Sequence, residues 1–342
     1  MPVRRAMNRR ARSWRAMATG LVALCAAGTV TACGGGSTDE PGGEDISSGS
    51  QHINLVAYAV PKAGFDLIIP AFRETDEGRD VGFSQSYGAS GDQSRKVARR
   101  VPADVVNFSV EPDITRLVKE GVVDKDWQDQ APNKSTPFGS VVALVVRKGN
   151  PKNIKDWDDL LKPGVQVVTP NPGSSGSAKW NLLAPFSAKS NGGRDVQAGL
   201  DYVSELIRNH VTVVPKSGRE ATTAFEQGQG DVLISYENEA IMLERQNATS
   251  SKNQQVDYVL PPQTFKIENP VAVVERTVAK KGTAQLAKAY LDYLYSDEAQ
   301  EIAAKHAIRP RSEAVLKKHA ATFKPLKQFT VAKYFGSLTE AQ

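Results

Sequence analysis

From residue 53 onward, short apolar segments alternate with amphipathic segments of helical length, and this alternation constrains the fold more than any other feature. It is typical of α/β units built around mostly parallel sheets. Residues 140–147 read SVVALVVR, an almost wholly apolar run of the kind that forms a fully buried strand. This run separates two α/β blocks, so we expect two lobes with the chain crossing between them. Ligands of such folds bind between the lobes, at the carboxyl ends of strands.

The pattern predicts the following elements. Strands are expected at residues 53–58, 80–86, 104–108, 140–147, 165–169, 231–235 and 271–274. Helices are expected at residues 61–73, 91–100, 112–120, 156–161, 176–189, 195–208, 219–227, 237–246, 283–295 and 296–305.

The excess positive charge of the chain lies in its first 32 residues. The formal net charge is +5, which for the whole chain suggests a nucleic-acid or anionic-membrane partner. However, residues 1–32 hold six arginines and no acidic residue, so the remainder carries a net charge of −1. We therefore expect no nucleic-acid partner.

The arginine-rich start is followed by a weakly apolar run, residues 16–32, which fits a secretory signal peptide and is short for a membrane-spanning helix. The run ends in VTACG at residues 30–34, which looks like a lipobox, the site where bacterial lipoproteins are diacylated on cysteine and cleaved before it. We predict a signal peptide over residues 1–32 and a lipidated Cys33. The alternative is an ordinary signal peptide in which Cys33 is incidental.

Residues 33–51 are rich in Gly, Ser and acidic residues, and we expect a flexible tether there. The body is then predicted to be secreted and anchored to the outer face of the cell membrane, in the periplasm or an equivalent extracytoplasmic space. The only other cysteine, Cys25, lies in the segment expected to be removed. Disulfides, zinc ribbons and iron–sulfur clusters are thereby excluded, and we expect no metal and no cofactor.

Three turns rich in serine and glycine each open a predicted helix. They read SYGASGDQ at residues 86–93, PNPGSSGSAKWN at residues 170–181 and KSGRE at residues 216–220. Free N–H groups and the positive end of the helix dipole make such a turn suited to an anion. A single turn of this kind is more often an ordinary N-cap with a loop glycine. Three together favour a buried oxyanion site, because no P-loop, dinucleotide fingerprint or nucleophile elbow accounts for them.

Six segments carry a family resemblance that covers almost all of the body. They are FSQSYGASG at 83–91, VVRKGNPK at 145–152, TPNPGSSGSAKWN at 169–181, GDVLISYENEA at 230–240, AYLDYLYS at 289–296 and RPR at 309–311. In these segments the chain resembles the sulfate-binding and thiosulfate-binding proteins of bacterial ABC importers.

The resemblance implies an α/β, two-lobed clamshell of the periplasmic-binding-protein type II class, in which each lobe is a mostly parallel sheet flanked by helices. Lobe I would comprise residues 52–138 and 259–342, and lobe II residues 139–258. The anion site would lie in the cleft between them. The family further implies a monomer that carries a dehydrated dianion on neutral donors and docks on an ABC permease.

Carried over by position, the resemblance implies these ligand contacts: backbone N–H groups of Ala59, Ser90, Gly176 and Ser177, the hydroxyl of Ser175, and residues Arg219 and Tyr236. Four of these depart from the family pattern, which has Asp at Ala59, Gly at Ser177, Ala at Arg219 and Trp at Tyr236. The Arg219 guanidinium could grip the dianion in bidentate fashion, or it could point to solvent while only its N–H serves. Both interpretations stay open.

The turns place no carboxylate at a donor position, which favours sulfate or its analogues over phosphate, whose proton needs an acceptor. Asp92 and Glu220 lie one residue further and are interpreted as partners of the helix dipole. A phosphate-binding or molybdate-binding lipoprotein remains an alternative, as does a lipoprotein that binds only other proteins.

An enzyme acting on sulfate esters is less well supported, because the four histidines form no triad or metal spacing. Glu237 and Glu239 are not spaced as a catalytic pair and are interpreted as structural polar residues. We predict no catalytic residues.

Overall fold

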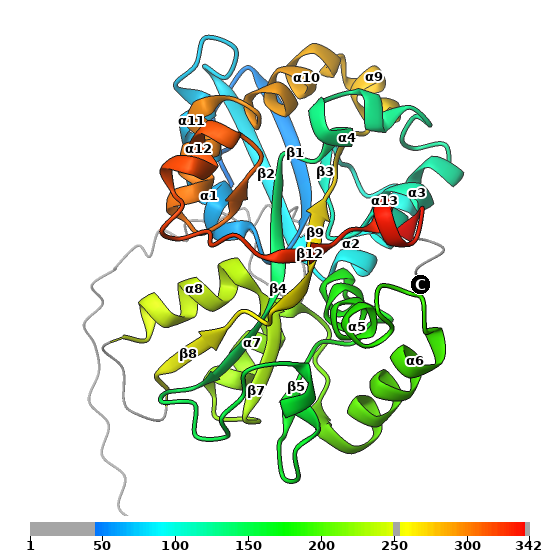
Figure 1. The fold of residues 1–342 in the computed structure, drawn as a ribbon. Helices are drawn as coiled ribbons and strands as arrows, with labels where there is room; N and C mark the ends of the chain where they lie inside the picture. The colour runs from blue at the N-terminus through cyan, green and yellow to red at the C-terminus, as the bar shows by residue number, and fades with distance from the viewer. Residues whose placement is uncertain (1–44, 249–253, 339–342) are drawn as a thin grey trace, which may run out of the picture. The chain divides into compact units, whose positions relative to one another are not determined.

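The computed structural model describes residues 45–248 and 254–338, which belong to one compact unit, residues 35–342. The described residues form two β-sheets with helices on both faces of each (Figure 1). We call each sheet with its helices a lobe. Cys33 and the predicted signal peptide lie outside the described residues. The two-lobed α/β architecture expected from the sequence is confirmed.

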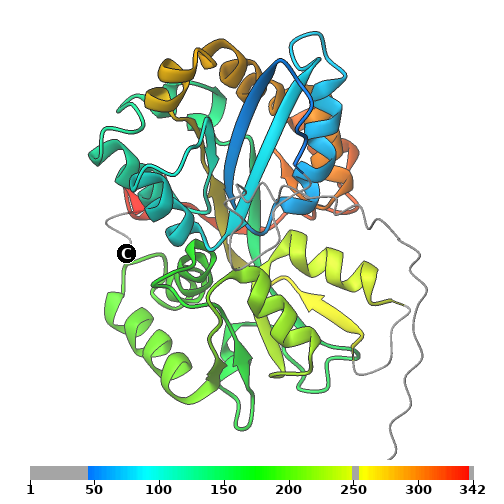
Figure 2. The same ribbon diagram turned by 180° about the vertical axis from the view of Figure 1, so that it is seen from behind.

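The first sheet has the order β10 (Val271–Val273), β3 (Val105–Asn107), β1 (Gln51–Tyr58), β2 (Val81–Gly88). The strand β1 runs parallel to β2 and β3, as Figure 2 shows from behind for β1 and β2, whereas β10 runs antiparallel to β3. One face packs against α1 (Lys62–Arg73), α10 (Ala284–Tyr293) and α11 (Asp297–Lys305). The other face packs against α2 (Ser90–Ala98) and α3 (Glu111–Lys119).

The second sheet has the order β12 (Lys327–Phe329), β9 (Gln263–Asn269), β4 (Phe138–Arg147), β7 (Val232–Tyr236), β5 (Val167–Val168), β6 (Val211–Val213). Two further strands, β8 (Val256–Val259) and β11 (Arg309–Pro310), also pair with β4. All partners of β4 run antiparallel to it, whereas β5 is parallel to β6 and β7. This sheet is therefore mixed rather than mostly parallel, because its central strand runs against its neighbours.

Helices α5 (Gly176–Lys189) and α6 (Val196–Glu205) pack on one face of the second sheet. Helices α7 (Gly218–Glu226) and α8 (Glu237–Gln246) pack on the other. The remaining helices are α4 (Pro132–Ser135), α9 (Glu275–Lys281), α12 (Glu313–Lys318) and α13 (Val331–Tyr334), with short helical turns at Trp127–Asp129, Trp157–Leu161 and Leu206–His210. No helix among residues 45–248 and 254–338 is both long enough and apolar enough to cross a membrane.

The strand β4 is the buried run expected at residues 140–147, and nine of its ten residues are buried. Its first half pairs with β9 and β11, and its second half pairs with β7 and β8. Each expected strand and helix is present, with ends that differ by a few residues. The strands β6, β8, β9, β11 and β12 were not expected, because they are short or mostly polar in sequence.

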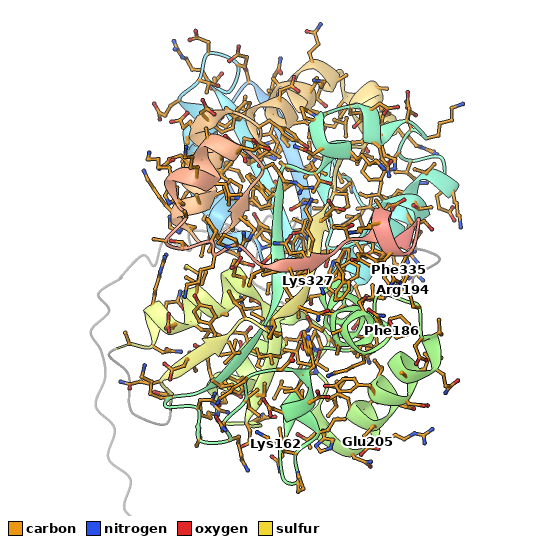
Figure 3. All side chains as sticks on the ribbon, in the orientation of Figure 1. Lys162, Phe186, Arg194, Glu205, Lys327 and Phe335 are labelled. Atoms are coloured by element: carbon orange, nitrogen blue, oxygen red, sulfur yellow. The ribbon has the colours of Figure 1, made fainter. Side chains whose placement is uncertain are left out.

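Several segments lie differently from the expected lobe boundaries. The strands β9 and β12, expected in lobe I, belong to the second sheet. Ile46 and Phe83 exchange backbone hydrogen bonds of 2.8 and 2.9 Å, so residues 45–50, expected in the tether, run along β2. Near the other end, the ring of Phe335 lies 6.2 Å from that of Phe186 in α5, and Figure 3 shows both side chains there. This terminal segment therefore packs on the second lobe, while the division of the chain into lobes stays a prediction.

Candidate functional site

Three helix N-termini from both lobes meet at one small cavity. Helix α2 begins at Ser90 in the first lobe, and α5 and α7 begin at Gly176 and Gly218 in the second. The cavity is lined by Tyr58, Ala59, Val60, Gly88, Ala89, Ser90, Ser109, Ser175, Gly176, Ser177, Ser217 and Gly218. The three serine–glycine turns of the sequence are thus brought together. Each helix start presents free N–H groups and the positive end of its dipole, which together stabilise an anion.

None of the residues that line this cavity carries a charged side chain. Its polar groups are serine and tyrosine hydroxyls and backbone amides. Such a lining offers hydrogen-bond donors to an anion without a carboxylate that would repel it.

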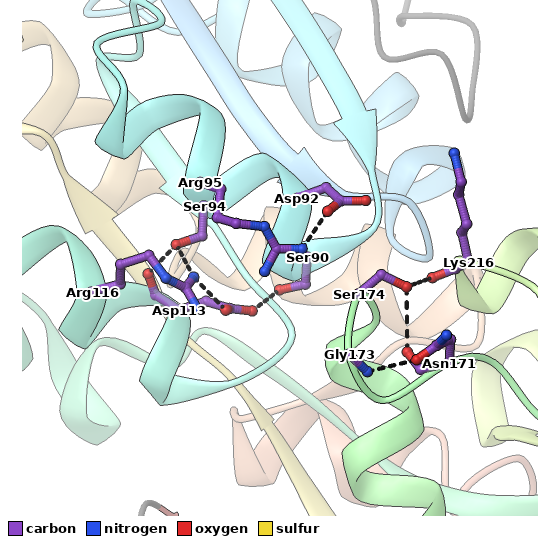
Figure 4. Close-up of polar contacts among 10 residues, drawn as sticks. All are labelled: Ser90, Asp92, Ser94, Arg95, Asp113, Arg116, Asn171, Gly173, Ser174 and Lys216. Carbon is purple, nitrogen blue, oxygen red and sulfur yellow. Dashed lines mark hydrogen bonds and ion pairs between the residues drawn. The ribbon is translucent and has the colours of Figure 1, made fainter.

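On the α2 side, a buried carboxylate holds the Ser90 hydroxyl. Ser90 Oγ donates to Asp113 Oδ2 at 2.6 Å and accepts from the Ser109 N–H at 3.0 Å. Asp113 also accepts from Arg116 Nη1 at 2.9 Å, and Figure 4 shows this network. Because the hydroxyl is used by the scaffold, the backbone N–H is the Ser90 donor that remains for a ligand, as the sequence predicts.

On the α5 side, a hydrogen-bonded turn precedes the helix. The N–H groups of Ser174 and Ser175 donate to the Asn171 carbonyl oxygen at 3.2 and 2.8 Å. Ser174 Oγ donates to the carbonyl oxygen of Lys216 at 2.7 Å, which ties this turn to the start of α7 (Figure 4). The hydroxyl oxygens of Ser175 and Ser177 lie 2.7 Å apart.

Gly176 and Ser177 show why these residue types occupy the first turn of α5. A Cβ on Gly176 would lie 2.6 Å from the Cβ of Ser109, so only glycine allows the lobes to approach this closely. Ser177 is the second residue of a regular helix, a conformation that any L-residue adopts. The change from glycine to serine at this position is therefore compatible with the backbone.

At the start of α7, Ser217 Oγ caps the helix by accepting from the Glu220 N–H at 3.1 Å. Glu220 Oε2 in turn accepts from the Lys216 N–H at 3.1 Å. Asp92 forms an ion pair with Arg95 within α2. Neither Asp92 nor Glu220 lines the cavity, in agreement with their interpretation as first-turn partners of the helix.

Ala59 lies at the end of β1 and lines the cavity, but its N–H donates to the Gly88 carbonyl oxygen at 3.0 Å. In this structure that backbone donor serves the junction between β1 and β2.

Arg219 and Tyr236 do not line the cavity. Arg219 lies in a neighbouring pocket between the lobes, where its Nε is 3.9 Å from Oε1 of the buried Glu239. The Tyr236 hydroxyl lies 2.6 Å from Ser109 Oγ. Burial raises the pKa of Tyr236 above its ordinary value of 10, so the phenol keeps its proton. The structure thus brings five of the seven predicted residues together and places these two beside them.

The lining also includes residues that were not predicted to contact the ligand: Tyr58, Val60, Gly88, Ala89, Ser109, Ser217 and Gly218. Gly88, Ala89, Ser217 and Gly218 lie inside the predicted turns, and Tyr58 and Val60 are the chain neighbours of Ala59, so the sequence already carried a signal for these six. Ser109 has no such signal, because it follows an ordinary predicted strand and enters the site only through tertiary packing.

The other acidic residues near the site have structural partners. Glu237 accepts from Arg309 Nε and Nη2 at 2.9 and 2.8 Å, and Glu239 Oε2 accepts from Ser235 Oγ at 2.9 Å. No histidine lines the cavity. No group of three or more His, Cys, Asp or Glu residues suited to a metal ion occurs in the described part of the chain.

Comparison with known proteins agrees with this geometry. Residues 53–309 match the family described as bacterial extracellular solute-binding protein. The chain is 40% identical to the sulfate-binding protein of Synechococcus elongatus over 313 residues, which are 90% of this chain and 87% of that protein. It is 40% identical to the thiosulfate-binding protein of Pseudomonas aeruginosa over 298 residues, which are 86% and 88% of the two chains.

Among solved structures, the sulfate-binding protein SubI from Mycobacterium tuberculosis H37Rv is 55% identical, with a TM-score of 0.79. The similarity covers 85% of this chain and 97% of that one. Relatives of this kind are solute-binding proteins and not enzymes. With its matched length, its fold and its three converging helix starts, the chain belongs to the bacterial extracellular solute-binding proteins, in the sulfate- and thiosulfate-binding family.

Proposed function

We propose that this protein captures sulfate or thiosulfate outside the cytoplasm and delivers it to the permease of an ABC importer. The observation that carries the proposal is the convergence of three helix N-termini, from both lobes, on a cavity whose lining has no charged side chain. The relatives named for sulfate and thiosulfate support the same choice of ligand.

Fully ionised sulfate suits this lining better than phosphate. Near neutral pH phosphate keeps a proton that needs an acceptor, and a dry cavity lined with donors would leave that proton facing other protons. The proposed ligand residues are Ser90, Ser175, Gly176 and Ser177, with Arg219 and Tyr236 next to them. Ala59 lines the cavity, while its N–H donates to the Gly88 carbonyl oxygen. The ligand would favour the arrangement in which the Ser90 turn meets the Ser175 and Gly218 turns.

Isothermal titration of the purified protein with sulfate, thiosulfate, phosphate and molybdate tests the proposal. We expect one sulfate or thiosulfate per protein and no competition from phosphate at equal concentration. Replacing Ser175 with Ala should lower sulfate affinity at least tenfold, since a hydrogen bond to a charged group contributes about 1.5–3 kcal/mol. Replacing Ser187 with Ala, a buried serine of α5 away from the cavity, should leave affinity unchanged. Turnover of a sulfate ester, or preferential binding of phosphate, would refute the proposal.

The mature protein is further proposed to be a monomer anchored to the outer face of the cell membrane through a lipid on Cys33. Support comes from the apolar run over residues 16–32 and the small residues that precede the cysteine. We expect wild-type protein in the membrane fraction and a Cys33→Ser variant in the soluble or secreted fraction. Equal distribution of both proteins would argue for an ordinary signal peptide.

A further inference from the structure

Ser109 holds a position in this site that neither a predicted turn nor a helix start accounts for. It follows β3 in the first lobe, it is fully buried, and it lines the anion cavity. Its Oγ would lie 2.8 Å from a Cβ at Gly176, so the hydroxyl is next to the first turn of α5. The hydroxyl proton of Ser109 can point toward Tyr236 Oη or into the cavity.

The backbone of Ser109 is held from both sides. Its N–H donates to Ser90 Oγ at 3.0 Å, and its carbonyl oxygen accepts from Trp180 Nε1 of α5 at 2.8 Å. The same carbonyl accepts from Asn269 Nδ2 at 3.2 Å. These contacts place the residue rigidly between the lobes and leave only the hydroxyl rotor to be determined.

The direction of that rotor depends on Tyr236 and on what occupies the cavity. Ser109 Oγ and Tyr236 Oη lie 2.6 Å apart, and either could donate by geometry alone. Each hydroxyl carries a single proton, so one proton lies between the two oxygens and the other points elsewhere.

A chain of donors follows from these contacts. An anion in the cavity accepts hydrogen bonds and donates none, so its presence favours the arrangement in which the Ser109 proton points to the anion and the Tyr236 proton points to Ser109 Oγ. Ser109 Oγ then accepts from Tyr236, and its own proton is left to point into the cavity that the residue lines. Polarisation along such a chain strengthens the last donor.

We propose that Ser109 is an anion-binding residue whose hydroxyl donates to the bound oxyanion, and that Tyr236 is a positioning residue that orients this hydroxyl. The inference rests on the proposed function, because it assigns a further donor to the same site. Tyr236 thus acts through Ser109, although the sequence assigned it to the ligand directly. Its hydroxyl and that of Ser109 together provide one donor, where the family pattern has the indole N–H of a tryptophan.

A double-mutant cycle measured by sulfate titration tests the proposal. Ser109→Ala should weaken sulfate binding about tenfold or more, as expected for loss of one donor to a charged group. Tyr236→Phe should weaken it less, by about two- to tenfold, because Ser109 keeps its proton but loses its orientation. The double variant should bind no more weakly than Ser109→Ala alone, within about twofold, because the two hydroxyls act as one unit.

The controls separate this proposal from the function on which it rests. Ser187→Ala should behave as wild type and Ser175→Ala should bind weakly. If Ser175→Ala loses affinity while Ser109→Ala does not, the role of Ser109 is refuted and sulfate binding stands. If wild type binds none of the oxyanions, the proposed function itself fails.

The melting temperature of ligand-free Ser109→Ala shows whether this substitution weakens binding by destabilising the fold. If the melting temperature of Ser109→Ala is lower than that of wild type, the sulfate affinity of Tyr236→Phe is the deciding measurement. An unchanged affinity in Tyr236→Phe would overturn the proposal. A sulfate-bound crystal structure should place Ser109 Oγ about 2.5–3.0 Å from a sulfate oxygen. A separation beyond about 3.5 Å would also overturn it.

Discussion

The backbone N–H of Gly91 donates to the carbonyl oxygen of Ser174, 3.0 Å away, and so joins α2 of the first lobe to the turn that precedes α5 of the second. A Cβ on Gly91 would lie 2.8 Å from the same oxygen. The hydrogen bond from Trp180 to Ser109 also connects the lobes. The turns that are expected to hold the anion therefore touch one another directly, and small residues at these positions allow it.

Gly91→Ala is expected to weaken sulfate binding about tenfold. The added methyl group forces α2 and the Ser174 turn apart, and overpacking of this kind costs about 1–3 kcal/mol. The penalty arises only where the lobes meet, so the melting temperature of the ligand-free protein should change little. Titration calorimetry and thermal unfolding measure the two effects. Ala98→Ser at the far end of α2 is the control, and wild-type affinity in Gly91→Ala would contradict the expectation.

Arg219→Ala is expected to lower sulfate affinity by less than tenfold. The guanidinium faces Glu239 in the pocket beside the anion cavity, so it acts on the anion only as a charge at a distance. The backbone N–H of residue 219 remains in the alanine variant. A direct charge-assisted hydrogen bond would contribute about 1.5–3 kcal/mol, equivalent to tenfold or more. Sulfate titration therefore decides between the two roles, and a loss as large as that of Ser175→Ala would establish direct contact.

Asp113→Ala is expected to lower the free energy of unfolding by about 2–3 kcal/mol. The substitution leaves the buried Ser90 hydroxyl without its acceptor and Arg116 without its ion pair. Asp92→Ala is a matched control, because its pair with Arg95 is partly exposed and surface pairs contribute about 0–1 kcal/mol. Urea denaturation measures both variants. Equal destabilisation by the two substitutions would show that the Asp113 network does not stabilise the fold.

Stability is expected to fall as the pH drops below about 6.5, in part because of His52. Burial and then the nearby Lys281 lower the pKa of His52 below its ordinary value of 6.5. The unfolded chain therefore takes up a proton on this residue at a higher pH than the folded protein does. This contribution to stability is complete above 6.5 and is lost between 6.5 and the lower pKa of the folded state.

Urea denaturation at pH 7.5 and pH 5.5 checks the direction of this effect. A His52→Gln variant should lose less stability between the two pH values than wild type. An identical loss in both proteins would assign the pH dependence to other groups.

Local sequence determined the helices, most of the strands and the three turns, because these features depend on neighbouring residues. The run at residues 140–147 reads as a buried strand from its apolar side chains alone. Glycine and serine at the starts of α2, α5 and α7 point to anion binding wherever those helices lie. The family resemblance likewise rests on contiguous segments, and it extends along almost the whole body.

Tertiary structure decided which of these groups meet. Three turns separated by tens of residues line one cavity only because two sheets place their helix starts face to face, a relationship that no local pattern records. The same packing brought Ser109 into the site, turned Tyr236 toward it rather than into the cavity, and set Arg219 against Glu239. The sequence determined the kind of donors the protein carries. The three-dimensional arrangement decided their direction, because a hydroxyl or guanidinium points toward whatever partner the fold places within its reach.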